Sequence, residues 1–593
     1  MDSYFTFWSN YAATDLLNLE KNEGRFFDGN LSMFIQGQST FRHFIYTLLN
    51  IPKTAKPVLR LALNPTTPAH VCRDFFAIHL LFDRQHDPYL NAEAVIHLWY
   101  SAKLPLALWR HIEVVMKRYY YDFDECFENA KRDQQSAYDD GVGYDVSYQM
   151  SWGGGQVKYV GNLFEHQWRL ISKVLKPTEQ MSTDQAAIVR VLDAEKSCEP
   201  LKVAASRMTP SRTAGLMKWR TDGLLLPFGH PTDGFDMPNP IFFQGDGCYP
   251  HGATAEPIAE WPMEFLDFQA GPLQNDVYGK LFYYLRDTLV RFQEESKRLS
   301  IMVGLTSVDM PMSLHRAPEP VMYDRIHMGD LWDFNPACNL TIAAGNLRHQ
   351  DQNPFATMLA MCRLSVTNSD AGLQEEICEE GYQTFEPSST ILDDYAPPIK
   401  IEQGCETETV IRRRIGLLMW RNWDKFSERF MHDAKLFAFH LSTDSETHKE
   451  TSVFKTGFLG MEYKDKNTIT RRWPNRLVHS KSDEPSLRDF ERHVGWFDTM
   501  PQRWLEWKRV ADADNNEWEM ARECVLESSW REMAEMQAKI IEEEAQSVAE
   551  QEDLEQRIRE LLAEDAADRE KSEKSAAAKA KAKASKRKKG KKK

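Results

Sequence analysis

The first 120 residues alternate between short apolar runs and helical patterns, and this alternation constrains the fold more than any other feature of the chain. Apolar runs at 31–36 and 58–63 have the length and composition of buried strands. Helical patterns follow them at 41–49, at 71–82, where apolar residues form one stripe, and at 92–100. The order strand, helix, strand, helix predicts a parallel, doubly wound α/β sheet.

Similar elements return after a long irregular stretch. Residues 224–262 contain seven prolines, so we expect a long irregular region. Such a region is either held in place by contacts with the rest of the chain or mobile. A helix is predicted at 277–299, strands are predicted at 301–305 and 323–328, and 356–364 is a further apolar segment. The charged, Tyr-rich stretch at 121–150 is interpreted as a helix and a connecting loop.

Changes in composition divide the 593 residues into six parts. The last two differ most from the rest, because the stretch from 518 to 562 lacks Pro and Gly and the Lys-rich end cannot bury a core. The predicted parts are an α/β domain at 1–120, a continuation of its core with a Pro/Gly-rich insertion at 121–370, an acidic linker at 371–408, an aromatic-rich block at 409–510, a long helix with coiled-coil spacing at 511–570, and a disordered basic tail at 571–593.

The charge of the chain is strongly divided. Residues 571–593 contain 12 basic residues and one acid, a net of +11, and subtracting this from the total of −15 leaves −26 for the first 570 residues. Such an acidic body argues against nucleic-acid binding by the folded part, because phosphate contacts need clustered cations. Nucleic acid could bind through the tail alone, which is equally typical of a nuclear-import signal or a solubilising terminus.

The sequence favours a cytoplasmic location, and the tail leaves a nuclear one open. No apolar stretch approaches membrane-spanning length, and the first residues lack the pattern of a secretory signal. The nine cysteines are scattered and offer no CxxC half-site for zinc. We therefore predict reduced thiols and no membrane association.

Motifs for common chemistries are missing from the sequence. Five histidines between His70 and His111 are not spaced to share a helical face, so we predict no metal site and place these side chains in solvent or at the edge of the core. There is no GxSxG elbow and no catalytic-cysteine signature, and no catalytic residue is assigned. The glycines at 153–155 are interpreted as a turn rather than a phosphate-binding loop, because no Lys-Ser/Thr follows them.

One segment has the order of structural elements that is found in nucleotide-binding sites. After the first strand, Gly37 begins a turn that leads into a helix, as in Rossmann-type sites, where glycines let the ligand approach the backbone. The second glycine position holds Ser39, and the end of the second strand holds Asn64 where an acid usually binds the ribose. A neutral amide forms a weaker hydrogen bond than a carboxylate does. Gly37, Ser39 and Asn64 are therefore interpreted as a vestigial cofactor site.

The same segment resembles an N-terminal domain of unknown function that is shared by axonemal dynein assembly factor 3 and fungal proteins, some of which carry a MYND zinc finger. In that family an apolar strand leads into Gly-x-Gly-Asp-x-Arg-His/Asn. Gly37, Arg42 and His43 match this motif, while Ser39 and Thr40 depart from its second Gly and its Asp. The resemblance implies a fold similar to S-adenosylmethionine-dependent methyltransferases, in a family better known for assembly than for catalysis.

Downstream segments resemble the fungal members of this family more closely than the dynein factor. They lie at 223–229, 238–240, 323–326, 353–357 and 471–477, the last with the sequence RRWPNRL. The MYND finger is absent, because the chain has no Cys/His cluster that could form one. A ciliary role is therefore not transferred to this chain.

Three functions follow as hypotheses. The first is a non-catalytic scaffold or assembly factor on a degenerate Rossmann-like, methyltransferase-like α/β core, without a cofactor, that binds protein partners, with the C-terminal helix as a candidate surface. The second is an active methyltransferase with S-adenosylmethionine as its cofactor. The third is a nucleic-acid-associated protein that acts through the Lys-rich tail.

Overall fold

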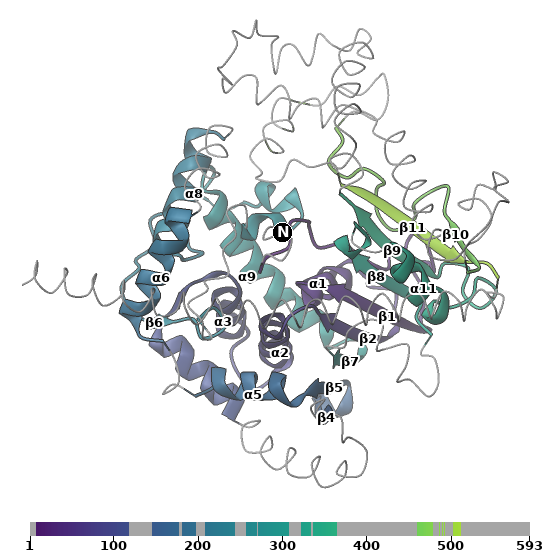
Figure 1. The fold of residues 1–593 in the computed structure, drawn as a ribbon, viewed down its shortest axis with the longest axis horizontal. Coiled ribbons are helices and arrows are strands. Elements are labelled where there is room, and N and C mark those ends of the chain that lie inside the picture. Colours follow the sequence, from purple (N-terminus) through teal and green to yellow (C-terminus); the bar gives the residue numbers. More distant parts are fainter. Residues whose placement is uncertain are drawn as a thin grey trace, which may run out of the picture.

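A computed structural model of the chain describes residues 7–117, 145–176, 181–196, 208–243, 256–269, 271–306, 322–333, 336–363, 459–477, 486, 489, 492 and 502–511. These residues form a mixed α/β structure around one large sheet (Figure 1). Its nine strands lie in the order β10-β11-β9-β8-β1-β2-β7-β5-β4, and a separate two-stranded sheet pairs β3 with β6.

The bounds of the strands show which parts of the chain build the sheet. They are β1 (Asn30–Gly37), β2 (Val58–Pro65), β3 (Lys103–Leu104), β4 (Asp145–Trp152), β5 (Val157–Phe164), β6 (Met237–Pro238), β7 (Ser300–Thr306), β8 (Arg325–Gly329), β9 (Thr357–Cys362), β10 (Met461–Tyr463) and β11 (Arg503–Arg509). Strands from the three predicted stretches 1–120, 121–370 and 409–510 thus share one sheet.

The helices lie between these strands in the sequence. The α-helices are α1 (Thr40–Asn50), α2 (Pro68–Phe82), α3 (Pro88–Tyr100), α5 (Glu165–Val174), α6 (Thr183–Lys196), α8 (Pro210–Asp222), α9 (Val277–Ser296) and α11 (Pro336–Asn346). The short 3₁₀ helices are η1 (Gly153–Gly155), η3 (Pro257–Glu260), η4 (Met263–Asp267) and η5 (Asp330–Asp333). In the described part of the chain, no helix has both the length and the apolar character needed to cross a membrane.

The middle of the sheet is parallel. Each neighbouring pair in the series β9, β8, β1, β2, β7 and β5 runs in the same direction, while β4, β10 and β11 are antiparallel to their neighbours. From β1 the chain adds β2 and β7 on one side, and later β8 and β9 on the other side. The strand order therefore reverses at β1.

Local sequence explains why the first helices begin where they do. Thr67 precedes Pro68, and its hydroxyl accepts a hydrogen bond from the backbone N–H of His70 at 3.4 Å. Asp87 precedes Pro88 in the same way and accepts from the Tyr89 N–H at 2.9 Å. A capping oxygen followed by proline at the first helical position is a strong start signal.

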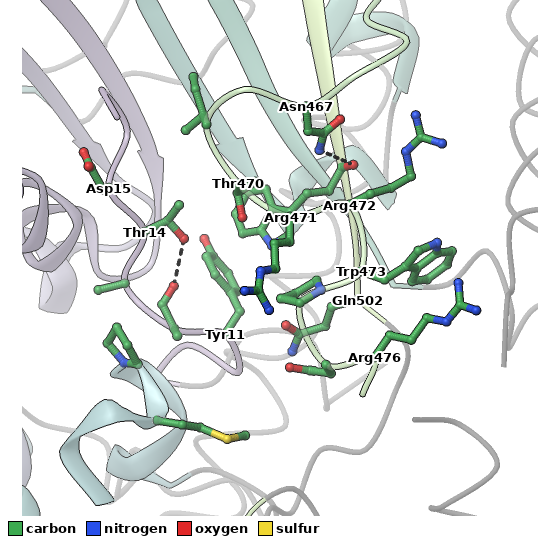
Figure 2. A pocket seen from close by; sticks show the side chains of 18 of the residues that line it. Tyr11, Thr14, Asp15, Asn467, Thr470, Arg471, Arg472, Trp473, Arg476 and Gln502 are labelled. Atoms are coloured by element: carbon green, nitrogen blue, oxygen red, sulfur yellow. Dashed lines mark hydrogen bonds between the residues drawn. The ribbon is translucent and has the colours of Figure 1, made fainter. Parts of the chain in front are cut away.

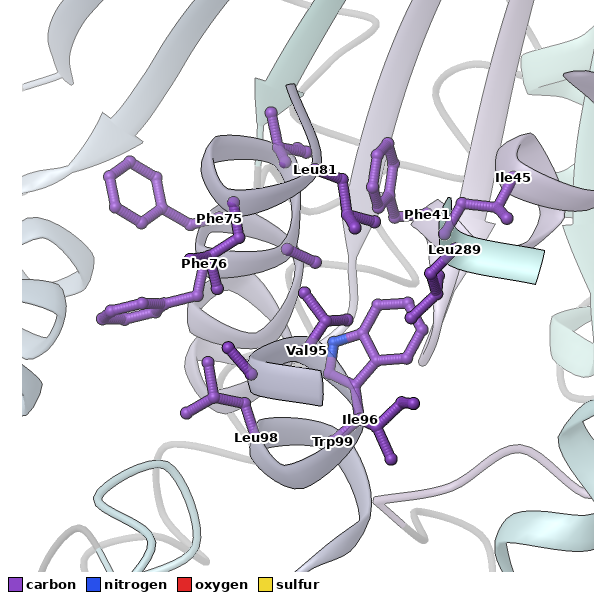
Figure 3. Packing of buried hydrophobic residues seen from close by; sticks show 14 of the residues in the cluster. Phe41, Ile45, Phe75, Phe76, Leu81, Val95, Ile96, Leu98, Trp99 and Leu289 are labelled. Atoms are coloured by element: carbon purple, nitrogen blue, oxygen red, sulfur yellow. The ribbon is translucent and has the colours of Figure 1, made fainter. Parts of the chain in front are cut away.

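The larger core lies on the face of the sheet that α1, α2, α5 and α9 cover. Alternate residues of β1 and β2 point into it, and Figure 3 shows side chains of α1, α2, α3 and α9 meeting there, among them Phe41, Phe75, Trp99 and Leu289. On the other face α11 packs against β8, β9 and β11 in a second cluster. Both faces of β8 and β9 are thus buried, as is usual in parallel sheets, whereas β2 and β7 expose Arg60 and Met302 on their second face.

The predicted elements of the first 120 residues are confirmed, and so are the later helix and strands. Two interpretations need correction. The helix at 71–82 is buried around nearly its whole circumference rather than on one stripe, because α3, α5 and α9 surround it. Residues 145–152 form strand β4 rather than a loop. The predicted turn at 153–155 is confirmed, because these glycines connect β4 and β5 in a hairpin. The predicted linker at 371–408 and everything after residue 511 lie outside the described residues.

Candidate functional site

The candidate site lies at the carboxyl ends of β1 and β8, where the strand order reverses. In open parallel sheets, ligands bind outside the carboxyl ends of the strands at such a reversal. Gly37 ends β1 with φ of 141°, and Gly329 ends β8 with φ of 55°. Side chains rarely adopt these backbone angles, so both positions favour glycine and leave bare backbone facing the site.

The space above these glycines is filled by Tyr11, which comes from the segment that precedes β1. A Cβ atom built on Gly37 would lie 3.6 Å from the Tyr11 hydroxyl, and one built on Gly329 would collide with it. Tyr11 is 3% exposed, and burial raises the pKa of its phenol far above the usual value. The chain itself thus occupies the position that a glycine turn leaves open for a ligand.

Aromatic and cationic groups surround Tyr11. The Arg42 guanidinium lies 5.0 Å from the centre of its ring, and the rings of His43 and His327 lie 5.6 and 6.1 Å away. The two histidine rings are 4.3 Å apart, and Trp504 of β11 closes the group. Burial lowers the pKa of both imidazoles, to about 3 for His327, so both are neutral near pH 7.

The segment that carries Tyr11 is anchored along its length. The Trp8 indole donates to the Trp99 carbonyl at 2.7 Å, and the N–H of Leu16 donates to the Thr47 hydroxyl at 2.9 Å. Between them, the Thr14 N–H donates to His43 Nδ1 at 3.1 Å. Backbone and side-chain bonds together hold this segment against α1 and α3.

Ser39 is the second predicted site residue, and its side chain faces inward. Its hydroxyl donates to Oε1 of Glu260 and accepts from Arg73 Nη1 at 2.6 Å. The hydroxyl therefore does not cap α1, although Ser39 is the N-cap residue. Instead, the Asp74 carboxylate on α2 accepts from the Phe41 N–H at 3.3 Å and from the Thr40 hydroxyl. The helix end that would face a ligand's phosphate already holds an acid.

Glu260 is the centre of a buried charge network. Its carboxylate accepts from Arg73 Nη2 at 2.5 Å, from the Tyr100 hydroxyl at 2.7 Å and from the Ser9 N–H at 2.9 Å. Arg42 donates to its carbonyl at 2.8 Å. Burial would raise the pKa of Glu260, but the two guanidinium groups outweigh that effect and lower it to about 2. The carboxylate is thus ionised and fully enclosed by its partners.

Asn64 is the third predicted site residue, and its side chain is bound to the neighbouring strand. It pairs in register with Gln36, and its amide donates to the Gln36 side-chain oxygen across the two strands at 2.5 Å. Both side chains are buried. The structure therefore brings Gly37 and Ser39 into one network and places Asn64 in a strand-to-strand contact beside it.

Beside Tyr11 lies an open pocket of about 1280 Å³. Residues 11–15 form one wall and residues 465–477, which include the motif RRWPNRL, form another (Figure 2). Trp473 and Trp504 contribute aromatic surface, and charged side chains line much of the rest. The closed glycine turn and this pocket thus share Tyr11 as a common wall.

The histidines from 70 to 111 do not gather around one point. His70, His79 and His97 are buried in the core, so the prediction of solvated or core-edge side chains is wrong for these three. Their nitrogens contact the Phe7 carbonyl, the Phe75 carbonyl and the Ser101 hydroxyl, respectively. Among the described residues, no group of three or more His, Cys, Asp or Glu side chains could hold a metal ion.

Sequence reasoning missed the residues that close the site. Tyr11 precedes the first predicted strand, and Glu260 lies in the Pro/Gly-rich stretch, 221 residues after Ser39. Arg73 belongs to α2, to which sequence reasoning assigned no buried charge. One signal was present, because Arg, Asp and two His residues occur within an otherwise apolar helix, which indicates buried polar contacts.

Comparison with known proteins finds a similarity for the part of the chain that contains most of this site. Among curated proteins and solved structures, none matches this chain. Residues 7–104 match a family described as a domain of unknown function, DUF4470. The matched range contains Tyr11, Gly37, Ser39 and Arg73, while Glu260 lies beyond it. The N-terminal α/β part of this chain is therefore similar to a domain of unknown function, and the rest of the chain supplies the carboxylate that closes its glycine turn.

Proposed function

We propose that this chain is a non-catalytic scaffold or assembly factor built on a degenerate methyltransferase-like fold. The strand order β7-β2-β1-β8-β9 supports the fold, because it is the order in which doubly wound nucleotide-binding sheets add their strands. The resemblance of the sequence to the domain of dynein assembly factor 3 and fungal proteins supports the same fold. Protein partners and a cytoplasmic location belong to this proposal.

One observation carries the non-catalytic part of the proposal: the chain fills its own ligand position. Tyr11 covers Gly37 and Gly329, and Ser39 is bound to Glu260 and Arg73. A cofactor at this turn would have to displace a buried phenol and expose an ion pair whose side chains are 0–1% exposed. Leaving buried charges without partners costs several kcal/mol, which is more than most contacts to a cofactor return.

Titration with S-adenosylmethionine tests this proposal. We expect calorimetry to show no saturable heat of binding at S-adenosylmethionine concentrations near 100 μM. A dissociation constant in the micromolar range would be detected at these concentrations. A methyltransferase of known affinity provides the positive control. The alternative, an active methyltransferase, predicts micromolar binding that Gly37→Trp abolishes and that the exposed substitution Arg110→Ala leaves intact. That result would contradict the scaffold proposal.

A further inference from the structure

The open pocket beside Tyr11 carries an excess of positive charge on an acidic protein. Among the described residues that line it, six are cations and four are carboxylic acids. The cations are Lys21, Lys466, Arg471, Arg472, Arg476 and Arg492. Since the first 570 residues carry a net −26, this local excess of two positive charges has the opposite sign to its surroundings.

Three cations of the pocket, Lys21, Lys466 and Arg471, are exposed, and Arg471 is the one among them whose planar guanidinium can bind a carboxylate through two parallel hydrogen bonds. Arg492 is paired with Asp267 and lies 3.6 Å from Asp489, and Arg472 donates to the Asp465 carbonyl at 2.6 Å. Arg471 is exposed, and no described residue accepts a hydrogen bond from its guanidinium. Figure 2 shows its side chain pointing into the pocket, toward Tyr11 and Gln502.

The backbone that presents Arg471 is fixed before any ligand arrives. Glu506, buried on β11, accepts three successive backbone N–H groups, from Thr468 at 2.8 Å, Ile469 at 2.8 Å and Thr470 at 3.1 Å. On the other side of Arg471, the Arg472 carbonyl accepts from the Trp504 N–H at 2.9 Å. Because this backbone is already ordered, binding an anion costs the side-chain entropy of Arg471 but adds no cost for ordering the loop.

The opposite wall is joined to this loop by direct contacts. The Asn18 amide donates to the carbonyls of Thr468 and Ile469 at 2.9 and 3.1 Å, and the Gln502 amide donates to the Asn10 carbonyl at 3.0 Å. Both walls therefore belong to one rigid unit. The pocket is a permanent feature of this surface rather than a gap between separately moving segments.

We infer that this pocket binds an acidic peptide segment of a partner protein, with Arg471 pairing with a carboxylate. Its volume exceeds the roughly 300–1000 Å³ of typical small-molecule pockets, and its lining of mixed polar and apolar groups suits a peptide backbone and side chains. Nucleic acid fits less well, because it carries a negative charge on every nucleotide, whereas a peptide can place a single carboxylate at Arg471 among the four carboxylic acids of the pocket. The inference rests on the proposed scaffold function, for which it supplies the chemistry of the partner.

The binding test uses the full chain and a fluorescein-labelled peptide, (Glu-Gly-Asp-Gly)₃, with (Gln-Gly-Asn-Gly)₃ as its neutral match. We expect saturable anisotropy changes with the acidic peptide only. Arg471→Ala should weaken binding about tenfold, which corresponds to about 1.4 kcal/mol. Arg110→Ala, another exposed arginine, should change affinity less than twofold. Because Arg471 is exposed, its variant should keep the melting temperature of the wild type.

A second measurement distinguishes binding in the pocket from binding to the Lys-rich tail, whose positive charge also attracts acidic peptides. A benzophenone group on the same peptide should cross-link to residues 11–15 and 465–477. Cross-links confined to 571–593, equal binding of the neutral peptide, or no binding at all would each overturn the inference. So would a labelled dT₁₂ strand that binds more tightly than the peptide and loses affinity in Arg471→Ala. The titration with S-adenosylmethionine tests the scaffold proposal separately.

Discussion

The closed glycine turn and the open pocket lie on either side of Tyr11, and they use charge in opposite ways. At the glycine turn the carboxylate of Glu260 is surrounded by Arg73, Arg42 and Ser39, and all four side chains are buried. In the pocket Arg471 is exposed, and the nearby buried carboxylate of Glu506 accepts backbone N–H groups and pairs with Lys464 at 3.5 Å rather than with Arg471. The first arrangement stabilises a filled site, and the second holds a cation ready for a ligand.

This difference shows that one segment of the chain can fill the space above a glycine turn and also line an open pocket. A glycine turn with an uncapped helix end attracts anions, and here Glu260 and Asp74 supply them from within the chain. The segment that closes the turn also forms a wall of the pocket, because Tyr11 borders both. Closing one site and shaping the other are thus consequences of the same packing.

The largest expected effect comes from removing the central charge of the closed turn. Glu260→Gln leaves the guanidinium groups of Arg73 and Arg42 buried without a carboxylate, so we expect the free energy of unfolding to fall by about 3–5 kcal/mol. Urea denaturation measures this loss. The exposed neighbour Glu264→Gln is the matched control and should change stability by less than about 0.5 kcal/mol. Equal effects of the two substitutions would contradict the network described here.

Tyr11→Ala should have the next largest effect. The substitution removes a buried ring that contacts Arg42, His43, His327 and Trp504, so a cavity would remain above the two glycines. We expect a loss of about 3 kcal/mol in the free energy of unfolding. Tyr89→Ala, at a half-exposed tyrosine, should cost much less. A small loss for Tyr11→Ala would mean that the ring does not seal the turn, and that a cofactor could displace it.

On the open side, Glu506→Gln tests the support of the pocket. The amide keeps one acceptor oxygen, so some of the three backbone N–H groups of the loop would face an N–H₂ group instead. We expect a loss of about 2 kcal/mol in the free energy of unfolding and weaker binding of the acidic peptide, although Arg471 is unchanged. Glu462→Gln, on the neighbouring strand, is the control, since its carboxylate is partly exposed in a pair with Lys508. Unaltered peptide affinity in Glu506→Gln would show that the loop needs no such support.

Part of the closed turn could be predicted from the sequence, and part could not. Apolar periodicity and glycines predicted β1, α1, β2 and the position of the turn, because these depend on residues close together in the chain. The same short-range sequence pattern predicted that Gly37 and Ser39 belong to one site. It could not reveal that Glu260 closes the turn, because the partners of a buried carboxylate depend on tertiary packing across more than 200 residues. Nor did it predict that β11, far along the chain, would join the same sheet.

The last prediction concerns pH, and its effect should be the smallest. His327 lies behind Tyr11 in the closed turn, and burial together with Arg42 lowers its pKa to about 3, whereas an unfolded chain binds a proton near pH 6.5. Between these values the unfolded state binds more protons, so stability is complete above pH 6.5 and falls as the pH decreases toward 3. At pH 5.5 this single histidine should account for a loss of about 1.4 kcal/mol.

Other buried groups also titrate in this range, so the effect must be isolated by difference. His43, His70, His79 and His97 act in the same direction, while the raised pKa values of Asp15 and Asp74, both about 6, partly offset them on acidification. His327→Phe keeps an aromatic ring against His43 and Trp504, so urea denaturation at pH 7.5 and 5.5 should show a smaller drop than in the wild type. The exposed substitution His230→Phe serves as the control. An unchanged drop in His327→Phe would mean that water reaches this histidine, and that the turn behind Tyr11 is less closed than its packing indicates.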